Sequence, residues 1–291
     1  MSLASALALI ESVKDDKVLF IGETIIDEYR FVAPLAKPPK ENVLAVRLLE
    51  TERYEGGTNA ACAHARSFCK AVQVFFGNEI IKTRYLDQDR RKLFEVQQLD
   101  ETFATEFHPL LSTLIDGVYA ITDFGHGALS PALVKELCGS NRFLAVAVQT
   151  NAANHGFNLL TKYPRADYAV IDEPEARLAA ADRHSSIEQV MRKLAFGRYA
   201  KLIVTHGKHG AYGLEGTRFL HAPTLSGLPL DTMGAGDAFF AVTAPMARTG
   251  SLEDLLMIGN AAGALKTQIL GHSASITKPA LIEYLNAHYA S

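Results

Sequence analysis

The sequence has few cysteines, no long basic run and no long apolar run. Its three cysteines, Cys62, Cys69 and Cys138, show neither paired spacing nor the Cys/His clusters that zinc needs. We expect them to be buried thiols in a reducing compartment. No stretch approaches about 18 uninterrupted apolar residues, so no membrane-spanning segment or membrane partner is expected. Segment 3–13 is apolar but lacks a leading positive charge and a cleavage site, which favours a short amphipathic helix and a cytoplasmic protein.

The charge balance also limits the kind of partner. The net charge is −3 over 291 residues, and Lys and Arg are not clustered. A surface for nucleic acid needs such clusters, so no nucleic-acid partner is expected. The length and the near-average hydrophobic content allow one or two domains, and we predict a single α/β domain over residues 1–291. Any phosphate must therefore be attracted by a local site and not by the overall charge.

One segment carries the strongest chemical signal. Residues 231–238 read Asp-Thr-Met-Gly-Ala-Gly-Asp-Ala and run directly into a helical stretch of small and aromatic residues. The glycines allow a ligand to approach the backbone, and the free N–H groups of the first helical turn form an anion hole. Asp237 would lie where a transferring phosphoryl group collects charge, which suggests a general base. A Gly-x-Gly-Asp junction can also be an ordinary helix cap, and the short motif alone leaves this open.

The longer pattern Asp-Thr-x-Gly-Ala-Gly-Asp at 231–237 resembles the signature of the ribokinase-like (PfkB) carbohydrate kinases. The resemblance implies a three-layer α/β/α sandwich with a β-strand lid. It also implies ATP and Mg²⁺ as cofactors and transfer of the γ-phosphoryl group of ATP to a hydroxyl of a sugar or sugar phosphate. Asp237 would accept the hydroxyl proton, and the N–H groups of Gly234, Ala235 and Gly236 would stabilise the phosphoryl oxygens. Thr232 is expected on the nucleotide side.

Two further elements match the sugar side of the family. The apolar run 18–22 has the pattern of a central parallel strand and brings Asp27 to the ligand-binding edge of the sheet. Gly56, Gly57 and Asn59 then open a helix predicted over 60–69. The family holds its sugar with an Asp and a glycine-pair element at these places, so all four residues are predicted to bind substrate. A solvated loop acid and a plain glycine turn with an Asn cap are the alternatives.

Two segments are predicted to lie outside the sheet as a lid. Segment 28–55 has strand-like alternation interrupted by prolines, and segment 79–100 reads as a hairpin. In several family members two lids pack together, so the resemblance implies a homodimer through the lid. Lys82 and Arg84 could hold a phosphate already on the substrate, or they could be an exposed cationic pair.

The second lid segment is most similar to the heptose 7-phosphate kinase domains of ADP-heptose biosynthesis. That likeness implies a separate nucleotidyltransferase as a partner. The chain departs from these domains at three places. The usual helix and strand before the hairpin are missing, so the core sheet could be one unit smaller. Asp123 is expected on the sugar side, but His126 replaces a lysine and lacks a permanent charge. Segment 149–154 is rich in amides where the heptose kinases have Asp-Pro-Lys.

The nucleotide side of the family is matched by a glycine turn. Thr205, Gly207 and Gly210 fall on the Thr-x-Gly-x-x-Gly turn that carries ATP, and a tight hairpin turn is the alternative. Asn260 lies in a long helix predicted over 252–270, at a place that lies beside the adenine in the family. Segment 271–275 could supply carbonyl groups for a monovalent cation such as K⁺.

Asp172 and Glu175 match the family motif Asn-x-x-Glu, which is linked to magnesium and phosphate. The change from Asn to Asp keeps the oxygen ligand that Mg²⁺ prefers. Acids at a helix start are also ordinary caps.

Two other functions stay open from the sequence. The chain could be a catalytically quiet, nucleotide-binding dimeric scaffold, or a kinase of a nucleoside or vitamin-like alcohol. Asp237 and its two glycines favour an enzyme, because a scaffold does not require that acid. The cationic lid favours a sugar phosphate over the other acceptors.

Overall fold

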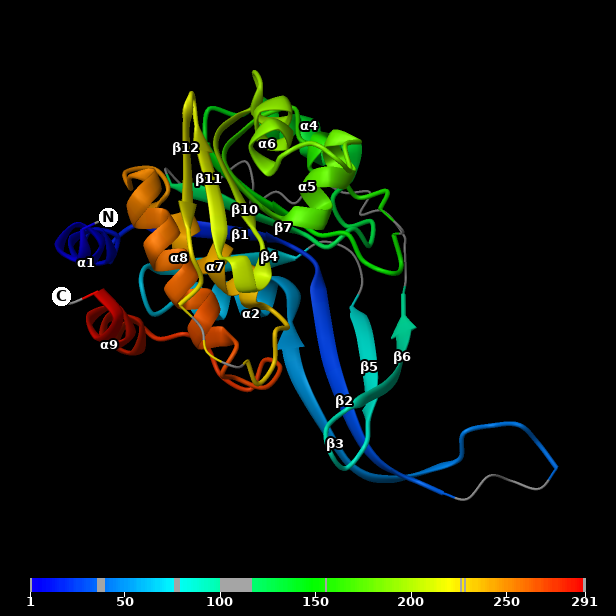
Figure 1. Cartoon of the computed structure of the whole chain (residues 1–291). Coiled ribbons are helices and arrows are strands. Elements are labelled where there is room, and N and C mark those ends of the chain that lie inside the picture. The colour runs from blue at the N-terminus through cyan, green and yellow to red at the C-terminus, as the bar shows by residue number, and fades with distance from the viewer. Residues whose placement is uncertain are drawn as a thin grey trace.

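Two β-sheets form the framework of the protein, and helices cover the larger one (Figure 1). The computed structural model describes residues 2–35, 40–75, 79–99, 117–154, 156–225, 227 and 229–289. The larger sheet has the strand order β12-β11-β10-β9-β8-β7-β1-β4, and the smaller one has the order β3-β2-β5-β6.

The larger sheet is parallel except at one edge. Its parallel strands are β1 (Lys17–Gly22), β4 (Lys70–Phe75), β7 (Val118–Asp123), β8 (Phe143–Val148), β9 (Ala166–Asp172) and β10 (Tyr199–Thr205). Two antiparallel strands, β11 (Ala211–Glu215) and β12 (Arg218–Ala222), complete it beside β10. The predicted apolar strands are therefore confirmed. Continuous apolar runs suit a parallel sheet because both of its faces are covered.

Helices on both faces make the sandwich that the sequence predicts. One face is covered by α4 (Pro131–Gly139), α5 (Glu173–Ala180) and α6 (Ile187–Ala195). The other is covered by α1 (Leu3–Ser12), α2 (Gly57–Ala65), α7 (Ala235–Thr243), α8 (Leu252–Lys266) and α9 (Lys278–Tyr289). Side chains alternate between the two faces along β1. Leu19 packs into the core under α4, α5 and α6, and Phe20 packs into the core on the opposite face. The predicted helix over 60–69 corresponds to α2, which begins and ends earlier in the chain.

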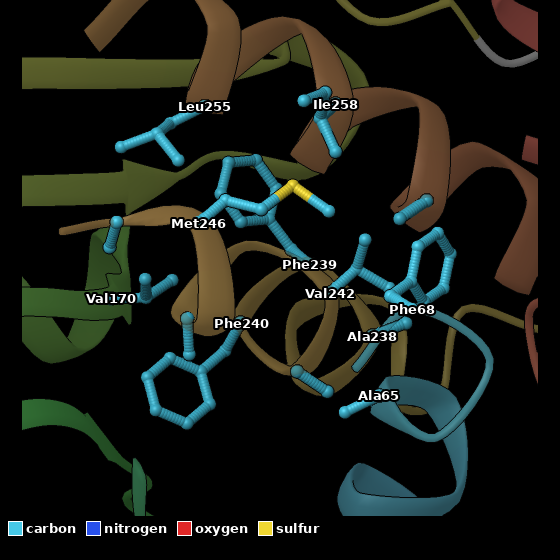
Figure 2. Packing of buried hydrophobic residues seen from close by; sticks show 14 of the residues in the cluster. Ala65, Phe68, Val170, Ala238, Phe239, Phe240, Val242, Met246, Leu255 and Ile258 are labelled. Carbon is cyan, nitrogen blue, oxygen red and sulfur yellow. The ribbon is translucent and has the colours of Figure 1, made fainter. Parts of the chain in front are cut away.

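Helix α7 is held in place by aromatic packing on small residues. Figure 2 shows Phe239 and Phe240 of α7 among apolar side chains that include Phe68 after α2 and Leu255 of α8. The ring of Phe239 fills the space at Gly259 of α8, where an added Cβ would lie only 2.3 Å from the ring. Tight packing of this kind fixes the position of the N-terminus of α7.

The smaller sheet extends away from the larger one (Figure 1). Its strands are β2 (Thr24–Pro34), β3 (Val46–Gly56), β5 (Ile80–Leu86) and β6 (Lys92–Gln98). β2 pairs parallel with β5, and the β2–β3 and β5–β6 pairs are antiparallel. The predicted lid segments 28–55 and 79–100 supply these strands, with residues 36–39 and 100 outside the described part.

The sequence predicts no membrane-spanning segment, and the length and composition of the helices bear on this prediction. Within the described part of the chain, no helix is long and apolar enough to cross a membrane.

Candidate active site

A cavity of about 520 Å³ opens at the carboxyl ends of β8, β9 and β10. This is the edge where open α/β sheets bind their ligands. The N-terminus of α7 forms one wall of the cavity, and the glycine turn after β10 forms another. The cavity therefore brings together two segments that are separated in the sequence.

The residues predicted for catalysis, nucleotide binding and metal binding all line this cavity. They are Gly234, Ala235, Gly236, Asp237, Thr205, Gly207, Gly210, Thr232, Asn260, Asp172 and Glu175. The residues predicted for substrate binding lie outside it. They are Asp27, Gly56, Gly57, Asn59, Asp123, Lys82 and Arg84.

The turn before α7 has the geometry of an anion hole. Gly234 has φ +72°, a left-handed conformation that glycine adopts without strain. Helix α7 begins at Ala235, so the N–H groups of Gly236 and Asp237 belong to its first turn and have no acceptor four residues back. With the helix dipole behind them, these groups favour a negatively charged ligand.

Asp237 is half-buried at the start of α7. Its Oδ1 accepts a hydrogen bond from Nε2 of Gln149, the residue that follows β8. Burial raises the pKa of Asp237, and the positive charges of His272 and Lys266 oppose the rise. A carboxylate of raised pKa is a stronger base than a free aspartate. The sequence singled out the amides of segment 149–154 but did not predict that Gln149 contacts Asp237, although its place just after a buried strand at the ligand-binding edge was a usable signal.

Asp172 and Glu175 form a capping box at the start of α5. Asp172 Oδ1 accepts from the Glu175 N–H at 2.7 Å, and Glu175 Oε2 accepts from the Asp172 N–H at 2.9 Å. Burial raises the pKa of both carboxyl groups. No cluster of three or more His, Cys, Asp or Glu suited to a metal exists among the described residues. Two carboxyl groups beside a cavity with the geometry of an anion hole would suit Mg²⁺, which keeps several waters and binds substrate phosphates.

The turn after β10 is shaped by glycine. Gly210 has φ +87°, and an added Cβ would lie 2.1 Å from the carbonyl oxygen of Ala222. No other residue fits there. Asn260 Nδ2 donates to the carbonyl oxygens of Ala222 and Pro223 at 3.0 and 3.1 Å. Asn260 therefore fixes the segment after β12, which forms part of the cavity rim near Thr224.

Asp27 is buried and held by the side chains of Arg84 and His272. Its Oδ1 pairs with Arg84, and its Oδ2 lies 3.2 Å from Nε2 of His272. Burial would raise the pKa of Asp27, but His272 and Arg84 outweigh it and lower the pKa to about 2. The carboxylate that the sequence predicts to hold sugar hydroxyls is thus already occupied by protein donors.

The alternative of an exposed cationic pair at Lys82 and Arg84 is wrong. Their exposed fractions are 9% and 7%. The guanidinium group of Arg84 has partners inside the protein. Its Nε lies 2.8 Å from Glu95 Oε2, its Nη1 pairs with Asp27, and the group lies over the ring of Tyr29. Burial lowers the pKa of Lys82, and Asp27 opposes this shift.

Gly56 and Gly57 both lie close to other parts of the chain. An added Cβ on Gly56 would lie 2.2 Å from Asp27 Oδ2, and one on Gly57 would lie 2.8 Å from the Glu23 carbonyl oxygen. The close approach at Gly56 is made by the carboxylate of the protein itself. Asn59 lies half-buried in the first turn of α2.

Asp123 and His126 are both buried. Asp123 is 1% exposed and accepts hydrogen bonds from Lys162, Tyr163 and Asn158, which occupy both carboxylate oxygens. Burial, with the nearby charge of Lys82, lowers the pKa of His126 to about 4, so this ring is uncharged at neutral pH.

The amide-rich segment 149–154 holds a neighbouring loop. Asn151 and Asn154 donate to the Phe124 carbonyl oxygen, and Asn154 also donates to the Gln149 carbonyl oxygen. Apart from Gln149, these amides stabilise the turn itself.

The fold is ribokinase-like, as comparison with solved structures shows. The chain is similar to a carbohydrate kinase from Agrobacterium tumefaciens (TM-score 0.68, 18% identity, covering 93% of this chain and 97% of that chain). It is similar to Arabidopsis thaliana ribokinase complexed with ribose and ATP (TM-score 0.67, 16% identity, 94% and 99%). A third similar structure is Escherichia coli phosphofructokinase-2 in complex with potassium (TM-score 0.67, 13% identity, 94% and 99%).

The family follows from the sequence comparison. The family model for pfkB family carbohydrate kinases matches residues 129–279, which is more than half of the chain. The chain belongs to this family of carbohydrate kinases. A search of curated protein sequences gave no match.

Proposed function

We propose that this carbohydrate kinase transfers the γ-phosphoryl group of ATP to a hydroxyl of a sugar or sugar phosphate. One observation carries the proposal: a single cavity joins the Gly207–Gly210 turn to the Gly234–Asp237 turn. The first turn would hold the nucleotide, and the second would receive the phosphoryl group. The similar Arabidopsis ribokinase is described with ribose and ATP, which supports this choice of substrates.

Asp237 acts as the general base in this proposal. It accepts the proton of the attacking hydroxyl, and Gln149 keeps its carboxylate oriented. The N–H groups of Gly234, Ala235 and Gly236 stabilise the negative charge on the transferring group. Bound Mg²⁺ would offset the remaining phosphate charge, with Asp172 and Glu175 holding it through water.

The acceptor is proposed to bind between Asp237 and the lid. The charges of Asp27 and Lys82 act on the pKa of Asp237, which supports an acceptor site near all three groups. A buried lysine there favours an acceptor that carries a negative group, such as a sugar phosphate. The heptose 7-phosphates belong to this class of acceptor.

The assembly and location are also proposals. A homodimer through the lid is supported by apolar side chains on its strands, where Leu48 is 54% and Val96 is 44% exposed. A cytoplasmic location is supported by three cysteines that are free and buried. The likeness of the lid to heptose kinase domains is the reason to propose a separate nucleotidyltransferase as a partner.

The test is magnesium-dependent ADP release with a panel of pentoses, hexoses, heptoses, their phosphates, nucleosides and vitamin-like alcohols. A mixture without acceptor gives the background ATPase rate. We expect one sugar or sugar phosphate to raise ADP release well above this background. If only a nucleoside or a vitamin-like alcohol is turned over, that compound would replace the sugar or sugar phosphate as the acceptor. ATP binding without turnover of any acceptor would favour the scaffold.

A further inference from the structure

A fully buried lysine lies directly behind the anion hole. Lys266, at the end of α8, has 0% of its surface exposed. Its Nζ donates to the Met233 carbonyl oxygen at 2.9 Å and to the Ile269 carbonyl oxygen at 3.4 Å. These carbonyls belong to the two loops that flank the start of α7. The ammonium group thus joins the two loops.

A carboxylate ties the same two loops together. Asp231 Oδ1 accepts from the Met233 N–H at 3.0 Å, and its Oδ2 accepts from the Gly271 N–H at 2.9 Å. Burial lowers the pKa of Lys266, and the charges of Asp231 and Asp237 oppose this shift. Carbonyl and carboxylate oxygens around one positive charge are the surroundings that a hard cation finds in a protein site.

The lysine also contacts the turn itself. A Cβ added to Gly234 would lie 3.3 Å from Lys266 Cε and 3.2 Å from the His272 ring. The side chain therefore packs against the backbone that presents the anion hole. Its charge acts on Asp237 as well. A fixed positive charge at this place stabilises negative charge that develops on a transferring phosphoryl group.

This arrangement disagrees with the monovalent cation that the sequence allowed at 271–275. A K⁺ ion between these loops would need carbonyl oxygens such as those of Met233 and Ile269, and the ammonium group already occupies them. A second positive charge beside a buried ammonium is unfavourable. The residues present therefore do not fit a bound monovalent cation.

We propose that the Lys266 ammonium is a built-in substitute for a monovalent cation, so that the two loops and the anion hole are held without K⁺. The inference rests on the proposed function, because it gives Lys266 a positioning role in the same phosphoryl site. It predicts a kinase of this fold whose nucleotide binding and turnover do not depend on K⁺.

The wild-type protein gives the first test. ADP affinity by calorimetry, the thermal midpoint and turnover are compared in KCl, NaCl and choline chloride at equal ionic strength. We expect ADP affinity and turnover to agree within about twofold across the three salts. A rise of fivefold or more in either quantity with K⁺ would overturn the proposal.

The second test removes the ammonium group in Lys266→Ala. We expect ADP affinity in choline chloride to fall at least tenfold, with recovery on adding K⁺, ammonium or methylammonium. Lys201→Ala is the matched control, because Lys201 Nζ also donates to two carbonyl oxygens, those of Ala247 and Gly250, away from the cavity. This control is expected to lower stability without creating a cation dependence.

The outcomes separate this inference from the proposed function. Unchanged ADP affinity in Lys266→Ala, or a loss that no cation restores, would contradict the inference. If Lys266→Ala does not fold, the wild-type salt comparison decides the question by itself. The inference would be upheld if ADP binding does not depend on cations in the wild type but does in the variant. If no acceptor is turned over in the same experiments, the proposed function would be rejected while the inference stands.

Discussion

The two parts of the candidate site are formed by different chemical groups, backbone turns in one and charged side chains in the other. The nucleotide half, defined as the cavity lined by the Gly207–Gly210 and Gly234–Asp237 turns, is made of backbone turns at strand ends and a helix start. The lid half, defined as the group Asp27, Lys82, Arg84 and Glu95, is made of charged side chains, of which the first three are buried and Glu95 is half-buried. The first half is an open cavity and the second is filled by its own ion pairs. Backbone turns can form a site before the ligand arrives, whereas charged side chains satisfy one another until a ligand replaces them.

The two halves are in contact through two side chains. Tyr29 of β2 donates from its hydroxyl group to the Met233 sulfur at 3.3 Å, and His272 lies beside Asp27. Both Met233 and His272 belong to the loops that Lys266 and Asp231 hold together. Movement of the lid strands would therefore act on the loops that carry the anion hole.

The largest effect is expected from breaking the buried ion pairs of the lid half. Arg84→Met leaves the buried Asp27 and the half-buried Glu95 without their guanidinium partner. We expect the free energy of unfolding, measured by urea titration, to fall by about 3–5 kcal/mol. Arg192→Met removes an exposed pair with Glu188 and should cost at most about 0.5 kcal/mol. Equal losses in the two variants would mean that the lid half does not depend on its buried charges.

Asp27→Asn tests the same half through pH. The pKa of Asp27 is lowered to about 2 in the folded protein, from an ordinary value of 3.8. Its ionised form therefore stabilises the fold above pH 4, and this contribution is lost as the pH falls toward 2. We expect the variant to lose about 2 kcal/mol at pH 7, with the difference from wild type shrinking below pH 4. A difference that is constant from pH 7 to pH 3 would argue against the ionic role.

His64 tests the region behind both halves. It is buried in α2, and its Nδ1 accepts from the Ile276 N–H at 2.9 Å. Burial, with the charges of His272 and Lys266, lowers its pKa to about 3 from 6.5. The neutral ring thus stabilises the fold above pH 6.5, and this contribution falls as the pH decreases. When the pH is lowered from 7 to 5, the free energy of unfolding of wild type should fall by about 2 kcal/mol more than that of His64→Gln, as measured by urea titration. Identical pH profiles would show that His64 is not buried as a neutral group.

The smallest effect is expected at the metal side of the nucleotide half. Glu175→Gln replaces a carboxyl group beside the cavity with an amide but keeps an acceptor for the Thr150 N–H. We expect the magnesium concentration for half-maximal turnover to rise about tenfold. Glu173→Gln, on the same helix but paired with Arg177, is the control and should leave the magnesium requirement unchanged. A shift in the control alone would remove Glu175 from the metal proposal.

The two halves also differ in how far the sequence could predict them. The parallel strands, the helices on both faces and the glycine turns follow from local patterns, so the larger sheet and the residues of the cavity were found. The turn at Gly210 needs glycine for its own backbone geometry, and such a need is visible in a motif.

The lid half could not be predicted in the same way. Whether Arg84 is exposed or buried depends on Asp27 and Glu95, which approach it only after three strands pair. The role of Gly56 depends on the carboxylate of Asp27, which comes from the neighbouring strand. Lys266 follows the Gly- and Ala-rich second half of α8, where a single long cation was a signal that went unused. Its two carbonyl partners are supplied by separate loops.

The most direct test of the account is turnover of Asp237→Asn with the best acceptor from the panel, measured together with ADP affinity. The amide keeps the shape of the side chain and removes the base. We predict that kcat falls by about 10²-fold or more while ADP affinity stays within about threefold of wild type. Turnover close to that of wild type would contradict the role of Asp237, and so would a loss of turnover that is fully explained by lost ADP binding.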